Sequence, residues 1–425
     1  MAKQKSVAGL APRLAAAHRL AAVLKGENFV PLAAADVPDA RDRALANRLV
    51  TTALRYHGPI SATLAQLLER GLPKKAGLFE SILRLSLAQL LFLPDLGAHS
   101  AIFLAAEAMR ADPRSQHLVR LMNGVLREAQ RRPPPEVSPA TLFPEPLLST
   151  WRATYGAASL VSFAQALLEG VPLDLTLKDT DPGLAGIPVL ADTVRLNDRD
   201  RAVADLPGYV DGRFWVQDAA SAIPARLLRL HPGARVLDIG AAPGGKTAQL
   251  IKAGYAVTAL DRDGNRMERL AGNLQRLRYA ADLVTADALD YTTSVPFDGI
   301  LLDAPCSATG TFRRHPEVVW HRDAADIAGR VELQRRLISR AIESLVPGGT
   351  LIYCVCSLEP AEGELQAAWA LEEGLEAVPI APAELDGWAE AVTKEGFVRT
   401  HPALTVPGGA GGTLDGFFVA RLRRR

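Results

Sequence analysis

The sequence predicts a multidomain protein with an all-α N-terminal domain, a small α+β bridge and a C-terminal α/β domain. Apolar residues recur at three- and four-residue spacing from about residue 8 to residue 132, which is typical of amphipathic helices. After residue 213 the pattern changes to strand, glycine turn and helix, repeated several times. The proline-rich stretch RRPPPEVSPA cannot continue a helix and indicates a boundary between these regions.

The first domain, over residues 1–132, is expected to contain roughly five to seven short helices. Segments such as RLAAAHRLAAVLKG and LFESILRLSLAQLLFL carry the helical spacing. This third of the chain has 19 Lys and Arg against 10 Asp and Glu, whereas the rest has 29 against 37. The basic excess suggests that the domain contacts a polyanion such as nucleic acid. A merely solvated basic face is the alternative.

The middle of the chain has a weaker pattern. Residues 133–140 are expected to form a proline-rich linker, and residues 141–212 a small α+β bridging subdomain. Helices are predicted through LLSTWRATYG and LVSFAQALLEG, and short strands around LDLTLKD and GIPVLADTVRL.

The last domain, over residues 213–425, is predicted to be Rossmann-like. Segments such as ARVLDIGAAPGGKTAQLIKAG and FDGILLDAPCSATG alternate strand, turn and helix. Alternation of this kind predicts a parallel sheet covered by helices on both faces. Ligands bind such sheets at the carboxyl ends of the strands, so the chemistry is expected in those loops.

The composition and the first residues indicate the cellular compartment in which the protein is expected. The longest apolar run, near LSLAQLLFLP, is well short of the roughly 18 residues that predict a membrane helix. The first residues continue into a helical pattern without the apolar core of a secretory signal, so a cytoplasmic protein is expected. The three cysteines, Cys306, Cys354 and Cys356, suit a reducing compartment in which thiols serve chemistry or packing.

The loop GAAPGGKT, residues 240–247, can be interpreted in two ways. It matches the P-loop pattern G-x-x-x-x-G-K-[ST], and Asp303 could then be the acidic residue that holds Mg²⁺ in a P-loop NTPase. However, Asp238 lies just before the loop and would repel bound phosphates. Pro243 also removes one of the backbone N–H donors that a phosphate site needs.

Acidic residues at the ends of the next two predicted strands favour a different ligand. Asp261 follows Asp238 by 23 residues, at a position from which a carboxylate can bind ribose hydroxyls, and Asp287 closes the strand after that. This arrangement suits S-adenosylmethionine, with ribose on Asp261, adenine near Asp287 and the amino-acid or sulfonium end beside the glycine loop. Each acid taken alone could instead be a strand-end cap.

The motifs LDIGAAPGGKT, DAPCSATGTFRRHPEVVW, YCVCSLEPAEGE and DGFFVARL resemble the Nol1/Nop2/Sun family of RNA cytosine-C5 methyltransferases. The N-terminal segments DRALANRLVTTALRY, LLRLSLAQLLFL and MNGVLR resemble the NusB-like RNA-binding domain of its bacterial members that act on small-subunit rRNA. The resemblance implies a class I methyltransferase domain, S-adenosyl-L-methionine as cofactor and RNA as substrate, with 16S rRNA favoured over tRNA. The residues implied in cofactor binding are Asp238, Gly240, Ala241, Ala242, Pro243, Gly244, Gly245, Lys246, Asp261, Arg266, Asp287 and Asp303.

Cytosine C5 is too weak a nucleophile to attack a methyl sulfonium directly, so a nucleophile must first add at C6. A thiolate suits that step, and nearby positive charge would favour the ionised form. By resemblance, Cys356 is the attacking residue and Cys306 assists release. Cys354 is interpreted as packing. Val355 stands where the family usually has Thr, which removes a hydroxyl without changing the thiol.

Other residues are given roles around this pair. Asp303 is expected to bind the N3 or N4 edge of cytosine, and Lys246 to orient the base or a phosphate or to stabilise the thiolate. The stretch FRRHPE contributes three residues that are expected either to contact the RNA backbone or to anchor the loop: Arg313, Arg314 and His315. The aromatic pair of DGFF is expected to form core and site wall: Phe417 and Phe418. The target base would have to leave its stack to reach such a pocket.

Two other functions stay open at this point. The chain could be a P-loop NTPase acting on RNA, or a non-catalytic RNA-binding assembly factor with a NusB-like domain. A metal site is not expected, because a structural zinc site needs about four ligands at close spacing and the chain offers only three cysteines.

Overall fold

The structure is a computed structural model that describes residues 7–190, 192–196 and 202–425. The chain forms two compact units. The first holds the described residues up to Ser149 together with His315–His321, and the second holds Thr150–Arg314 and Arg322–Arg425.

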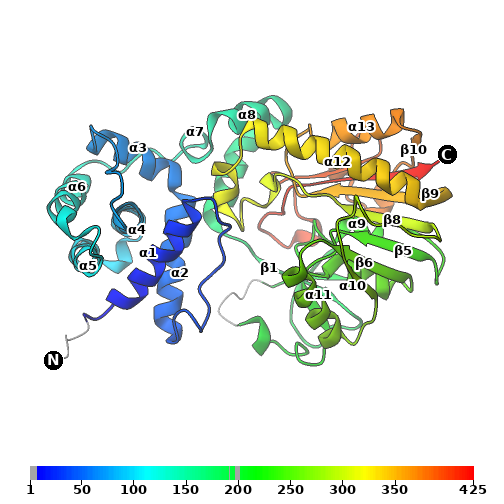
Figure 1. The fold of residues 1–425 in the computed structure, drawn as a ribbon, viewed down its shortest axis with the longest axis horizontal. Coiled ribbons are helices and arrows are strands. Elements are labelled where there is room, and N and C mark those ends of the chain that lie inside the picture. Colours follow the sequence, from blue (N-terminus) through cyan, green and yellow to red (C-terminus); the bar gives the residue numbers. More distant parts are fainter. Residues whose placement is uncertain (1–6, 191, 197–201) are drawn as a thin grey trace. The chain divides into compact units, whose positions relative to one another are not determined.

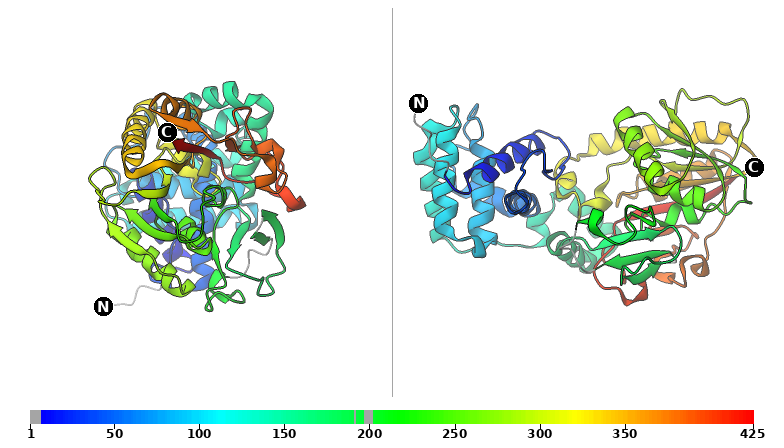
Figure 2. Two further views of the ribbon diagram at one scale, coloured as in Figure 1. Left: turned by 90° about the vertical axis from the view of Figure 1, so that its right-hand side faces the viewer. Right: turned by 90° about the horizontal axis from the view of Figure 1, so that it is seen from below.

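The first unit is a helical bundle, coloured blue to cyan in Figures 1 and 2. Helix α4 lies at its centre, because its side chains are buried almost all round, as expected of a helix surrounded by others. The bundle confirms the predicted all-helical pattern up to residue 131. The helices of this unit are α1 (Leu10–Val23), α2 (Ala40–Arg55), α3 (His57–Leu67), α4 (Phe79–Phe92), α5 (Ala98–Ala111), α6 (Val119–Arg131) and α7 (Pro139–Leu142).

A short segment from far along the chain also packs in the first unit. The 3-10 helix η5 (Pro316–Trp320) contacts α2, and Glu317 Oε1 accepts a hydrogen bond from Phe29 N at 2.9 Å. The Trp320 ring lies 4.8 Å from the ring of His57, and burial lowers the pKa of that histidine to about 3.

The second unit begins within a long helix, whose first residues belong to the first unit, and continues into a small antiparallel sheet. Helix α8 (Glu145–Glu169) is interrupted at Gly156, whose φ of 79° is outside the helical range. The sheet has the order β2-β3-β1-β4, and β4 pairs with β1 although the sequence placed its residues in the C-terminal domain. The strands are β1 (Leu173–Leu177), β2 (Ile187–Leu190), β3 (Thr193–Leu196) and β4 (Phe214–Val216).

The main sheet has the order β10-β12-β9-β8-β5-β6-β7, and β11 also pairs with β12. Pairing is parallel from β9 to β7, as predicted, but β12 is antiparallel to both β9 and β10. The prediction of a wholly parallel sheet was therefore wrong at this edge. The strands are β5 (Arg235–Ile239), β6 (Ala256–Asp261), β7 (Asp282–Thr285), β8 (Phe297–Asp303), β9 (Leu345–Val355), β10 (Leu375–Ala377), β11 (Val398–Thr400) and β12 (Phe417–Arg424).

Helices cover both faces of this sheet. Helices α12 and α13 pack together on one side, whereas α10 and α11 lie on the other (Figure 1). From β5 the chain continues to β6 and β7 on one side, and β8 and β9 lie on the other. The carboxyl ends of β5 and β8 therefore flank the point where strand order reverses, which is where such folds bind ligands. The helices are α9 (Ile223–Arg226), α10 (Gly245–Lys252), α11 (Gly264–Leu277), α12 (Ala324–Ser344) and α13 (Glu364–Glu372).

In the parts of the chain given above, none of the helices combines the length and apolar character needed to cross a bilayer.

The small sheet depends on a buried ion pair. Arg195 donates to both carboxylate oxygens of Asp174, at 2.7 and 2.8 Å, and both side chains are buried. We expect Arg195→Ala to lower the free energy of unfolding of the second unit by about 3–5 kcal/mol, because it leaves a buried carboxylate unpaired. Urea unfolding followed by circular dichroism measures the change.

The matched control is Arg213→Ala, since Arg213 pairs with Asp179 at 2.8 Å on the exposed surface of the same subdomain. That variant should lose less than about 1 kcal/mol. Equal losses in the two variants would contradict the role given to the buried pair.

Candidate active site

The glycine loop starts where β5 ends and touches the end of β8. Gly240 has a φ of 77°, and a Cβ there would lie 2.4 Å from the carbonyl oxygen of Asp303. Glycine is therefore required both for the backbone conformation and for the close approach of the two loops. Helix α10 begins at Gly245, inside the segment GAAPGGKT.

Asp238 lies beneath this loop. Its side chain is fully buried and accepts a hydrogen bond from Thr247 Oγ1 at 2.6 Å. Burial raises the pKa of Asp238 to about 7, even though the hydrogen bond from Thr247 acts in the opposite direction. Asp238 lines neither of the two cavities described below, so this placement favours support of the loop over the direct cofactor contact expected from the sequence.

Lys246 and Asp303 form an ion pair at the carboxyl ends of β5 and β8. Lys246 Nζ donates to Asp303 Oδ2 at 2.8 Å and lies 3.4 Å from Ser221 Oγ. Burial opposes the charged form of Lys246, but Asp303 and the nearby thiols together hold its pKa above the ordinary value. The same ammonium group lies 5.3 Å from the centre of the Phe417 ring.

Cys306 and Cys356 are brought together because β8 and β9 are parallel neighbours, with Asp303 in register with Cys354. Their Sγ atoms lie 3.5 Å apart. Cys306 is buried and Cys356 is partly exposed. The contact with Cys356, then burial and the charge of Glu362, raise the pKa of the Cys306 thiol well above its ordinary value.

Cys354 is wholly buried and belongs to a hydrophobic core against which Cys356 also packs, whereas Cys306 belongs to the other core cluster of this sheet. This burial agrees with its interpretation as a packing residue. Its sulfur lies 3.7 Å from Asp303 Oδ1.

Two cavities meet at these residues, with volumes of about 620 and 340 Å³. The larger cavity is lined by the whole glycine loop from Gly240 to Lys246, and by residues of the small sheet and α11. The smaller cavity lies at the ends of β6, β7 and β8 and against α12. The residues that line both cavities are Gly240, Arg266, Asp303 and Cys356.

The chemistry of the smaller cavity suits the nucleoside part of S-adenosylmethionine. Asp261 and Asp287 supply carboxylates at the ends of successive strands, while Leu333 and Leu337 of α12 give an apolar wall. Asp261 is held in place, since its Oδ2 pairs with Arg266 Nη1 at 3.0 Å and accepts from Ala242 N at 3.3 Å. The predicted acids at strand ends thus lie in one cavity beside the thiols.

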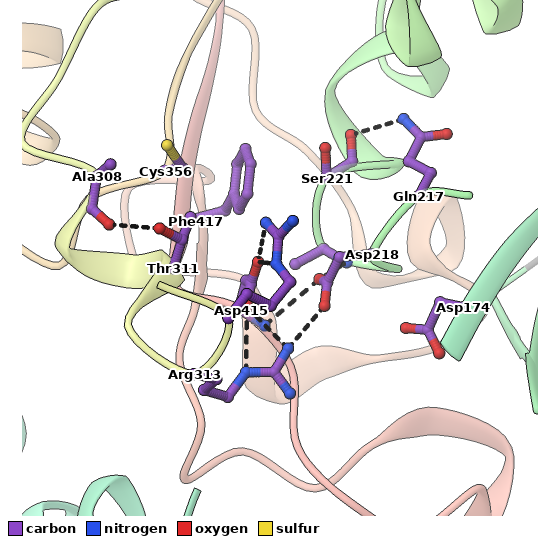
Figure 3. A network of polar contacts seen from close by, with 12 residues as sticks. Asp174, Gln217, Asp218, Ser221, Ala308, Thr311, Arg313, Cys356, Asp415 and Phe417 are labelled. Carbon is purple, nitrogen blue, oxygen red and sulfur yellow. Dashed lines mark hydrogen bonds and ion pairs between the residues drawn. The ribbon is translucent and has the colours of Figure 1, made fainter. Parts of the chain in front are cut away.

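The stretch FRRHPE separates into residues with different surroundings. Arg313 is fully buried, and its guanidinium donates to Asp218 at 2.7 Å and to Asp415 at 2.8 Å (Figure 3). It is therefore a loop anchor that cannot bind an RNA backbone. Arg314 pairs with the other oxygen of Asp415 and lines the larger cavity. Of the three residues predicted to contact an RNA backbone, it is therefore the one placed to meet a ligand there. His315 belongs to the first unit.

The two phenylalanines of DGFF lie where they were expected, one in the wall of the site and one in the core. Phe417 lines the larger cavity beside Cys356 (Figure 3), and Phe418 is wholly buried in the core.

Several residues that line this site were not predicted from the sequence. Ser221, Asn273 and Arg276 line the larger cavity, and Leu333 and Leu337 the smaller one. The leucines lie on the apolar face of a helix, where the same pattern equally indicates ordinary core packing. For Ser221, the available signal was its place in the segment FWVQDAASAIPARLL, which leads into the glycine-loop region.

Comparison with known proteins identifies two families. The model of the family described as 16S rRNA methyltransferase RsmB/F matches residues 225–423, and the model of the NusB family matches residues 11–131. Relatives called ribosomal RNA small subunit methyltransferase B are similar over nearly the whole chain. The protein of Xanthomonas campestris pv. campestris is 37% identical, with 99% of both chains covered. That of Xylella fastidiosa strain Temecula1 is 35% identical, with 97% of this chain and 98% of the relative covered.

Solved structures agree on the fold. The crystal structure of PH0851 superposes with a TM-score of 0.76 over 99% of this chain and all of that chain, at 20% identity. A methyltransferase homologue from Pyrococcus horikoshii gives a TM-score of 0.52 and 27% identity over 67% of this chain and 96% of that one.

These similarities decide between the functions that the sequence left open. They favour methyl transfer over nucleotide hydrolysis by a P-loop and over a non-catalytic assembly factor. The geometry gives a physical reason, because the lysine of the P-loop-like motif is paired with Asp303 beside two thiols. The chain belongs to the RsmB/F family of 16S rRNA methyltransferases, which depend on S-adenosylmethionine.

Proposed function

We propose that this enzyme methylates C5 of a cytosine in small-subunit rRNA through a transient bond between Cys356 and cytosine C6. The observation that carries the proposal is the pair of thiols 3.5 Å apart, one of which lines both cavities. A target base in the larger cavity would meet Cys356, while a methyl donor in the smaller cavity would lie on the other side of the same residue.

In the proposed reaction the Cys356 thiolate forms an S–C6 bond, and the electron pair of the C5–C6 double bond moves toward C5. The enriched C5 then forms the new carbon–carbon bond to the methyl group, while the bond from that methyl to the sulfonium sulfur breaks and its electron pair stays on the sulfur. A base takes the C5 proton, the C–H electron pair restores the C5–C6 double bond, and the S–C6 bond breaks, which returns the thiolate to Cys356. Cys306 is positioned to assist this release, since its sulfur contacts that of Cys356.

Asp303 is proposed to select cytosine. Its carboxylate pairs with the Lys246 ammonium group at 2.8 Å, and a carboxylate only accepts hydrogen bonds. Such a group attracts the N4 amino group of cytosine and repels the carbonyl oxygen that uracil carries there. Arg314 at the rim of the larger cavity is proposed to bind a phosphate of the RNA.

S-adenosylmethionine supplies the electrophilic methyl group. The residues proposed to hold it are Asp261, Asp287 and Arg266, with the glycine loop from Gly240 to Lys246 at its amino-acid end. Asp238 would act indirectly by holding Thr247 at the start of α10.

Small-subunit rRNA is proposed as the substrate because the relatives that match almost the whole chain carry that activity in their names. In this proposal residues 1–132 form the RNA-binding domain, 133–140 the linker, 141–212 the bridge and 213–425 the catalytic domain. The NusB family match and the basic excess over residues 1–132 support RNA binding by the first of these. Bisulfite sequencing of rRNA from cells with and without the protein identifies the modified nucleotide.

We expect Cys356→Ala to abolish methyl transfer, because the variant has no group that can add to C6. The assay measures the transfer of labelled methyl groups from S-adenosylmethionine to rRNA purified from cells lacking the enzyme. Cys354→Ala is the matched control, since it removes a thiol two residues away that packs in the core, and it should retain most of the activity. Substantial methylation by the Cys356 variant would rule out the assigned nucleophile.

We expect Cys306→Ala to accumulate a covalent protein–RNA complex, because the adduct forms while its release is slowed. The complex should be visible as a slowly migrating band on denaturing gels. The band should disappear in the double variant Cys306→Ala/Cys356→Ala. A band that persisted in the double variant would mean that another residue bonds to the RNA.

A further inference from the structure

A buried polar cluster lies directly behind the two thiols. Its centre is Glu362, which is fully buried and lines neither cavity. Its carboxylate accepts hydrogen bonds from Ser307 N at 2.9 Å, Ser307 Oγ at 2.5 Å and Ser357 Oγ at 2.6 Å. Gln334 Nε2 also donates to it at 3.0 Å.

The two serines make this cluster relevant to the reaction. Ser307 directly follows Cys306, and Ser357 directly follows Cys356. One carboxylate therefore contacts the loop after β8 and the loop after β9, each one residue beyond a thiol. The serine hydroxyls also lie 3.0 Å from each other, so the two loops are joined both directly and through Glu362.

Helix α12 supports the Cys306 loop from another direction. Its Gln334 donates to the carbonyl of Pro305 at 3.0 Å, and its Arg330 to that of Cys306 at 3.0 Å. Arg322, just before the helix, donates to the carbonyl of Ser307 at 2.8 Å. Three successive carbonyls are thus held, and Gln334 connects this support to Glu362.

The burial of the Glu362 carboxyl group needs an explanation beyond stability. Burying such a group costs free energy unless hydrogen bonds offset the cost, and its oxygens receive donors from both thiol loops. The contact with Cys356 and burial raise the pKa of the Cys306 thiol, and the nearby Glu362 raises it further.

We propose that Glu362 is a positioning residue that holds Cys306 and Cys356 in contact, so that the covalent RNA adduct is released as fast as it forms. The inference rests on the proposed function for its catalytic consequence, but the contact between the thiols can be tested without RNA.

The first test measures the separation of the thiols directly. A diazene dicarboxamide oxidant takes up the two thiol hydrogens and joins sulfurs that can approach bonding distance, and mass spectrometry of the digested protein identifies the Cys306–Cys356 disulfide. We expect Glu362→Ala to form this disulfide at least about tenfold more slowly than the unmodified protein, because the loops separate. Glu362→Gln keeps the shape and one acceptor oxygen and should be intermediate.

The second test measures catalysis. Glu362→Ala should lower kcat by about ten- to a hundredfold with little change in KM for RNA, and a covalent protein–RNA complex should build up during turnover. A residue that only stabilised the fold would lower the amount of active enzyme without building up this complex.

Glu359 provides the matched control. It is a buried acid of the same cluster that accepts from Trp151 Nε1 at 2.7 Å, and its side-chain contact with the loop after β8 is a long one, from Thr309 Oγ1 at 3.5 Å. Burial raises its pKa to about 7, so the neutral Glu359→Gln is a mild change. This variant should form the disulfide and turn over like the unmodified protein.

If Glu362→Ala does not fold, Ser307→Ala removes one hydroxyl donor on the Cys306 side and should show the same two effects to a smaller degree. A disulfide rate in Glu362→Ala and Ser307→Ala equal to or above that of the unmodified protein would overturn the inference. Failure of the proposed function would look different, since Cys356→Ala would then still methylate RNA while the disulfide result stood.

Discussion

The parallel pairing of β8 with β9 is the constraint on which the site depends. Register places Asp303 beside Cys354, so the loops that carry Cys306 and Cys356 leave the same edge of the sheet from adjacent strands. Backbone hydrogen bonds continue beyond the strands, from Ala304 N to the carbonyl of Cys354 and from Gly310 N to that of Cys356. Two thiols that are 50 residues apart in sequence are thereby brought into contact by the backbone.

Around that backbone the charges are arranged unequally. Lys246 and Asp303 lie on the cavity side of the thiols, where Cys356 is partly exposed. Glu362 and its serines lie on the buried side, where Cys306 is held. The contact with Cys356, burial and the charge of Glu362 raise the pKa of the Cys306 thiol, whereas Cys356 faces both cavities. Two chemically identical side chains therefore acquire different roles from their surroundings.

The sequence could predict the parts of this arrangement that follow from local pattern. Strand and helix alternation placed the glycine loop, Asp261, Asp287, Asp303 and the thiols at one sheet edge, and cavities lie there. It could not predict strand order, so the antiparallel β12 was missed. The sequence also could not show which of the adjacent charged residues in FRRHPE is buried. Arg313 is buried because it pairs with Asp218 and Asp415, which come from distant segments. Glu362 was overlooked for the same reason.

The central claim is that the sulfur of Cys356 bonds to the pyrimidine ring, and RNA carrying 5-fluorocytosine tests it most directly. Fluorine at C5 cannot leave as the proton does, so an adduct that forms on the unmodified enzyme should persist. Mass spectrometry of the digested complex should then find the nucleotide, already methylated at C5, on the peptide that contains Cys356. Attachment at Cys306, or methylated RNA without any attachment, would contradict this account.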